Sequence, residues 1–262
     1  MVRGSGGAVR TAGVRVAAVV FALTWLVYPG FGVPDLAVTW DPAWAVALNA
    51  GWGLLFTVLV AAAFVRIAVR PQRSAPAVVQ LLCVAAVLAV SAAVSFEWGL
   101  LLVALAVAGE TLAVAFVPGR EPLTAGGVRV DRPLAVLAGL GALPWLLYAH
   151  EMYAANRVGL PDDITIGLDH YSVQGAVGLV LVVLSVTAAA WARGRRYVGV
   201  GAGLVAAYLG LVCLAQPDTP GGLAPVWSAL SILWGIAFGA VAAVRGTGAV
   251  TTDAAATPVP EH

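Results

Sequence analysis

The chain of 262 residues is 61% hydrophobic and only 10% charged, with a mean hydropathy of +0.95. Soluble domains carry about 25% charged residues, so this composition cannot cover a water-facing surface, and the surrounding solvent must be largely lipid. The formal net charge is +1 and every basic residue is arginine, which excludes nucleic acid as a partner and excludes lysine-dependent Schiff bases and P-loops.

Eight apolar segments are long enough to cross a membrane, which takes about 20 residues for roughly 30 Å of hydrocarbon. They lie at residues 13–31, 43–68, 75–95, 98–117, 133–154, 170–192, 197–215 and 223–244. Lipid cannot satisfy open backbone polar groups, so each segment must be helical. The sequence therefore predicts an all-α polytopic membrane bundle over residues 1–244, followed by a disordered cytoplasmic tail over residues 245–262.

The arginines predict the orientation of this bundle. Thirteen of the fourteen fall on one side of the predicted topology, before the first span, in alternate connections and after the last span, and only Arg157 falls on the other side. Short connections rich in arginine stay in the cytoplasm. We therefore expect a multi-pass protein of the cell membrane with both termini cytoplasmic. Arginine in place of lysine indicates a GC-rich genome, and hence a bacterial cytoplasmic membrane.

Two distant segments resemble each other. Residues 22–28 read ALTWLVY and residues 142–148 read ALPWLLY, 120 positions later, and the third and fourth spans shifted by the same number fall near the seventh and eighth. Four spans return the chain to its starting side, so the two halves would be parallel, as in some transporters. The match raises the hypothesis of a 4+4 parallel internal repeat, although biased composition also produces chance matches.

Glu110 lies deep in the fourth predicted span, twelve residues from its start, or about 18 Å along a helix. A carboxylate in hydrocarbon costs roughly 2.5–3.5 kcal/mol on insertion scales, so such residues face the bundle interior and tend to be functional. Glu110 is therefore the candidate intramembrane titratable group. The structural alternative is a neutral glutamic acid hydrogen-bonded between helices, with Thr57, Gln80 and Tyr208 as candidate partners.

A second candidate site is an outer polar cluster at the end of the bundle opposite the arginines. It consists of Glu97, His150, Glu151, Asp169 and His170. The two histidines end one span and begin the next, so we expect them to share one pocket that responds to pH or contacts a ligand. Imidazoles with carboxylates could also bind Zn²⁺ or a haem. The alternative is that Asp169 caps the sixth span and the histidines meet water and headgroups.

No catalytic motif is complete. His150 and Glu151 begin the zinc-protease motif His-Glu-x-x-His, but Ala154 stands where the second ligand is needed. A Gly-x-Ser-x-Gly nucleophile elbow is also absent. We therefore expect no catalytic residues, no metal and no cofactor. The lipid bilayer is the expected surrounding, with a small molecule or ion as ligand, and no protein partner is indicated.

Two further features concern packing. Pro144 falls in the middle of the fifth span, where it should kink the helix and open a cavity beside Trp145 and Tyr148. The stripe of Gly199, Gly203 and Ala207 in the seventh span should let a neighbouring helix approach closely.

The leading functional interpretation is a membrane protein that binds or transports a small solute or proton. The first alternative is a non-catalytic membrane scaffold or assembly partner. The second is an intramembrane enzyme that modifies lipid, for which no nucleophile and base can be assembled from the sequence.

Overall fold

The computed structural model describes residues 5–41, 43, 46–117, 119–123, 127–161 and 164–246. Within them, eight helices are long and apolar enough to cross a membrane. The protein is therefore an all-α polytopic membrane bundle, as the sequence predicts. The expected disordered tail lies outside the described residues from residue 247 onward.

The first half of the chain contains the first four of these membrane-spanning segments. Its elements are α1 (Ser5–Leu26), α2 (Gly32–Val38), α3 (Val46–Leu54), the π-helix η1 (Leu55–Ala61), α4 (Ala62–Val69), the 3₁₀ turn η2 (Pro71–Arg73), α5 (Ala75–Ser95) and α6 (Trp98–Ala115). The segments α3, η1 and α4 follow one another without a break and together make one span.

The second half contains four long helices and one short hairpin. They are α7 (Arg132–Val158), β1 (Ile164–Thr165), β2 (Leu168–Asp169), α8 (His170–Ala190), α9 (Arg195–Ala215) and α10 (Pro225–Arg245). The hairpin strands are antiparallel and pair Ile164 with Asp169. Helix ends carry the expected signals: Asp131 caps α7 by accepting from the Leu134 amide at 3.3 Å, and Gly159 ends α7 in the left-handed conformation.

The boundaries differ most from the expected spans in α1 and α7, and α1 begins at Ser5, eight residues before the expected start. Helix α1 ends at Leu26 instead of continuing to residue 31, because Pro29 lacks the amide hydrogen that a continuing helix would need. Helix α7 continues to Val158, four residues beyond the expected end. Near the middle of the second span, η1 is wound as a π-helix, and the Gln80 side chain donates to its Leu59 carbonyl at 2.8 Å. That bond satisfies a backbone acceptor inside the membrane.

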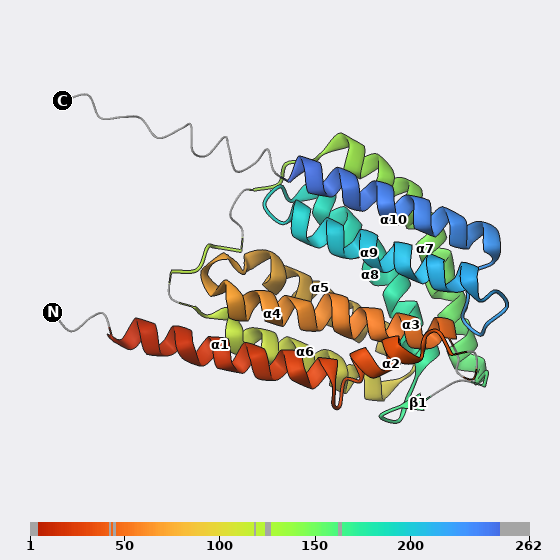
Figure 1. The fold of residues 1–262 in the computed structure, drawn as a ribbon, viewed down its shortest axis with the longest axis horizontal. Coiled ribbons are helices and arrows are strands. Elements are labelled where there is room, and N and C mark those ends of the chain that lie inside the picture. Colours follow the sequence, from red (N-terminus) through yellow and green to blue (C-terminus); the bar gives the residue numbers. More distant parts are fainter. Residues whose placement is uncertain are drawn as a thin grey trace.

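The spans form an inner and an outer layer (Figure 1). More than half of the residues are buried in the four inner spans, α3–α4, α5, α8 and α9, against 22–39% in α1, α6, α7 and α10. In the first half α1 packs on η1 and α4, and α5 packs on α6; in the second half α7 packs on α8, and α9 on α10. This shared packing order is compatible with the duplication, which stays a hypothesis.

The small-residue stripe of α9 forms the closest helix contact. A Cβ atom added at Gly203 would lie 2.5 Å from the carbonyl oxygen of Gly235, and one added at Gly235 would lie equally close to the Gly203 carbonyl oxygen. Because no side chain separates the two backbones, α9 and α10 approach as closely as the sequence predicts.

Arg195 fastens the start of α9 to the two preceding helices. Its guanidinium donates to the carbonyl oxygens of Arg129 at 2.8 Å and Ala188 at 3.3 Å, and lies 3.8 Å from the Asp131 carboxylate. These partners precede α7 and end α8, so one buried side chain fixes three helix ends.

Candidate functional site

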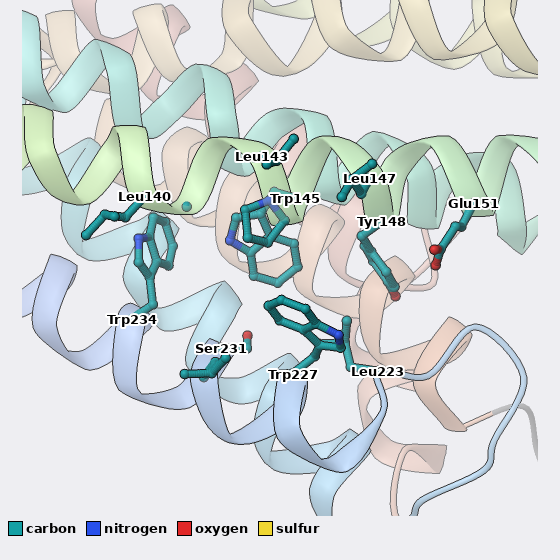
Figure 2. Close-up of a pocket in the computed structure, with 13 residues that line it drawn as sticks. Leu140, Leu143, Trp145, Leu147, Tyr148, Glu151, Leu223, Trp227, Ser231 and Trp234 are labelled. Carbon is teal, nitrogen blue, oxygen red and sulfur yellow. The ribbon is translucent and has the colours of Figure 1, made fainter.

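A pocket of about 560 Å³ lies between α7 and α10 (Figure 2). The pocket lies where the sequence predicts a cavity, since Pro144, Trp145 and Tyr148 all line it. Leucines of α7 and tryptophans of α10 form most of the remaining wall, with Glu151 at one end.

The aromatic part of the wall is held in place by contacts among its own side chains and with the α7 backbone. Trp145 packs edge-to-face against Tyr148, with ring centroids 5.8 Å apart, and against Trp234 at 6.2 Å. Trp234 donates from its indole nitrogen to the Leu137 carbonyl at 2.8 Å. A Cβ at Gly141 would lie 2.6 Å from the Trp234 ring, so glycine leaves the room that this indole occupies. The aromatic surface is thus fixed before any ligand arrives.

The pocket opens sideways. Leu140 and Leu143 of α7 are 67% and 65% exposed, and Trp227 of α10 is 51% exposed. All three lie on outer helices of a membrane bundle, where exposed surface meets lipid. A molecule would therefore reach this pocket from the bilayer, between the two helices, and not through the centre of the bundle.

The hydroxyl groups of the pocket are already used within the protein. Tyr148 donates to the Gly221 carbonyl at 2.6 Å and accepts from the Gln174 amide, while Ser231 donates to the Ala206 carbonyl at 2.6 Å. Glu151 differs from them. Its side chain is exposed and, in the part of the chain that the structure describes, makes neither a hydrogen bond nor an ion pair.

The depth of Glu151 can be estimated from the length of α7. It lies 19 residues after Arg132, where the helix begins at the arginine-rich end. At 1.5 Å per residue this is about 28 Å, close to the roughly 30 Å thickness of the hydrocarbon. By the same measure Leu140 lies about 12 Å from the start. The pocket therefore runs from near the membrane centre to its far boundary, with the carboxylate at the boundary.

Glu110 occupies a different seam, between α1 and α6. It is half-buried, and its carboxylate accepts a hydrogen bond from the indole of Trp25 at 2.6 Å. Trp25 in turn stacks on Phe56 of η1, with centroids 5.0 Å apart. Of the three candidate partners named from the sequence, Gln80 binds the Leu59 carbonyl and Tyr208 accepts from Trp40 at 3.1 Å. The Thr57 hydroxyl is buried without a hydrogen-bond partner among the described residues.

The residues of the outer polar cluster differ in burial and in their contacts. His150 is exposed on α7, whereas His170 is buried, stacks on Trp52 with centroids 4.8 Å apart and lies 2.9 Å from the Thr165 hydroxyl. Asp169 caps α8 by accepting from the Tyr171 amide at 2.8 Å.

Only Glu151 of this cluster lines the pocket, and Glu97 immediately precedes α6. Asp162 and Asp163, two acidic residues between α7 and β1, lie outside the described residues. Among the residues that the structure describes, no three of His, Cys, Asp and Glu are grouped so that they could hold a metal ion.

Comparison with known protein families, with curated proteins and with solved structures found no match. Function is therefore argued from the geometry of the pocket. Sequence reasoning placed a cavity beside Pro144, Trp145 and Tyr148, and assigned Glu151 to a separate outer cluster. It missed the α10 wall, since nothing in the sequence pairs the fifth span with the eighth.

Proposed function

We propose that the protein is a multi-pass protein of a bacterial cytoplasmic membrane, with both termini in the cytoplasm, that binds a small amphipathic molecule between α7 and α10. The observation that carries this proposal is the laterally open pocket of about 560 Å³. Its size lies within the range of about 300–1,000 Å³ that is usual for small-molecule sites, and aromatic walls with few polar groups are typical of them.

The chemistry of the walls supports an amphipathic ligand. Leu140, Leu143 and Leu147 form an apolar surface that suits an alkyl chain, whereas Glu151 offers a polar contact only at the membrane boundary. A ligand with an apolar body and a polar head would match both parts at once. Such molecules partition into bilayers, which agrees with a pocket that opens to lipid.

The other functional interpretations have less support. A lipid-modifying enzyme needs a nucleophile with a base, and among the described pocket residues Glu151 is the one acidic or basic side chain besides the Tyr148 phenol. Solute or proton movement through the bundle would rely on Glu110, which lies in the α1–α6 seam and is bonded to Trp25. A scaffold role requires an outer face that docks a partner, and a pocket with a charged mouth is less suited to that than a flat apolar face.

The test is photolabelling in lipid nanodiscs with decanol that carries a diazirine on its chain, followed by peptide mapping. Labels should concentrate on peptides from α7 and α10. Leu230→Phe, which fills the pocket, should reduce this labelling several-fold because the ring takes the space of the chain. Leu105→Phe is the matched control, since Leu105 is a lipid-facing residue of α6 outside the pocket. Labelling spread evenly over all outer helices would contradict the proposal.

A further inference from the structure

Among the residues that the structure describes, no basic side chain forms an ion pair with the carboxylate of Glu151. The nearest basic side chain along α7 is Arg157, whose guanidinium donates instead to the Val94 carbonyl at the end of α5, at 3.0 Å. His150 adjoins Glu151 in sequence but does not line the pocket. Asp218, in the connection before α10, adds a second exposed negative charge at this end of the bundle. The mouth of the pocket is therefore negative in potential.

The aromatic rings beside Glu151 reinforce this potential. In Figure 2 the Tyr148 ring lies next to the Glu151 carboxylate, and the Trp227 ring lies on the opposite wall, farther from the carboxylate than Tyr148. The face of an aromatic ring carries negative electrostatic potential, so it attracts a cation and repels an anion. An anionic head would be repelled by both the carboxylate and the rings, and a neutral head would gain only a hydrogen bond. A cationic head is attracted by both.

We infer that the pocket selects an alkyl ammonium amphiphile, with its cationic head between Glu151 and the rings of Tyr148 and Trp227. This inference rests on the proposed function and adds the charge of the ligand to it. The alkyl chain runs along α7 toward Leu140, eleven residues before Glu151, which gives it about 16 Å of helix length. A head at the boundary and a chain directed to the membrane centre is also the orientation that an amphiphile adopts in the bilayer itself.

The size of the expected selectivity follows from the two attractions. Cation–π contacts and an ion pair at a partly desolvated boundary each change affinity by a factor of a few, so a cationic head should bind about tenfold better than a neutral head on the same chain. Glu151→Gln removes the charge while keeping the shape of the side chain. It should therefore reduce the preference without reducing the binding of the neutral ligand.

The experiment compares two photoactivatable probes of equal chain length, decyltrimethylammonium and decanol, in nanodiscs of phosphatidylcholine. Labelling of α7 and α10 peptides is divided by labelling of the α6 peptide, which corrects for the partitioning of each probe into the bilayer. The wild-type ratio should favour the ammonium probe about tenfold, and Glu151→Gln should lower this preference to about threefold, because the cation–π contacts remain. Trp227→Leu should lower the ammonium labelling more than the decanol labelling, because it removes a ring face but keeps an apolar wall.

His150→Gln is the matched control, because it changes a neighbouring exposed side chain of α7 that does not line the pocket; it should keep the wild-type preference. Equal labelling by both probes in the wild type, or an unchanged preference in Glu151→Gln, overturns the inference while the proposed function stands. If neither probe concentrates on α7 and α10, the proposed function itself fails.

Discussion

In each half of the chain, the first long helix meets the last: α1 meets α6, and α7 meets α10. The two seams differ in the side chains that lie between the helices. A buried tryptophan lies at each, Trp25 in the first and Trp145 in the second, 120 positions apart. In the first seam the carboxylate of Glu110 binds the indole within the membrane at 2.6 Å. In the second seam position 230, the counterpart of Glu110 at the same spacing, is a leucine that lines the pocket.

The difference shows how the position of a charge decides what a helix seam can do. A carboxylate inside the hydrocarbon must have a partner, and Glu110 accepts a hydrogen bond from Trp25 that joins α6 to α1. A carboxylate at the boundary needs none, because water reaches it, so Glu151 is left to contact something else. In the second seam, the Trp234 indole donates a hydrogen bond to the Leu137 carbonyl and so joins α10 to α7. Leu137 is near the arginine-rich end of α7, and the pocket extends from there toward the opposite end.

The largest effect should come from separating α9 and α10, the packing that supports the pocket wall. Gly203→Leu would place a side chain against the α10 backbone, where a Cβ already lies only 2.5 Å from the Gly235 carbonyl oxygen. We expect a loss of about 3 kcal/mol or more in the free energy of unfolding, measured by SDS denaturation in mixed micelles.

The matched control in the first half is Gly109→Leu on α6, where a Cβ meets nothing within 4 Å. That change should alter stability by less than about 0.5 kcal/mol. If the two leucine variants unfold alike, the close approach of α9 and α10 does not stabilise the bundle as described.

An intermediate effect is expected from the Trp25–Glu110 bond. Glu110→Ala removes the acceptor and leaves the buried indole N–H unpaired, which should cost about 1–3 kcal/mol in the same unfolding assay. Glu110→Gln keeps an oxygen that can accept the bond, so it should stay within about 1 kcal/mol of the wild type. An alanine variant as stable as the wild type would show that the bond does not hold the first seam.

The smallest effect should come from the bond that joins the second seam. Trp234→Phe removes the donor to the Leu137 carbonyl but keeps most of the ring, and should cost about 1 kcal/mol. Trp98→Phe, at an exposed tryptophan of α6, is the control and should be close to neutral. A larger loss for Trp98→Phe than for Trp234→Phe would contradict the account of the second seam.

The spans could be predicted because crossing a membrane imposes a length and a composition on every helix. The rotation of each helix about its axis could not. In lipid the outside of a bundle is as apolar as its core, so hydrophobic periodicity does not show which face is buried. For this reason the depth of His150 and His170 could be read from the sequence, but not that one is exposed and the other buried.

The sequence also could not predict which helices pack against each other. The partner of Glu110 is Trp25, 85 residues earlier, and no local pattern joins them. The π-helix η1 likewise receives a hydrogen bond from Gln80 of another helix. The pocket was foreseen in part, because Pro144 is a local signal whose effect on a helix does not depend on its neighbours.

Arg195 links the final fold to the order in which the chain assembles. Its guanidinium can reach the carbonyls of Arg129 and Ala188 only after α7, α8 and α9 have all taken their places. Until then it is a hydrated cation that opposes passage across the membrane. During insertion, the charge of Arg195 thus opposes movement of the connection between α8 and α9 across the membrane. In the folded protein, the same side chain is buried and links helix ends through hydrogen bonds. Replacement of Arg195 by a neutral residue would remove both contributions.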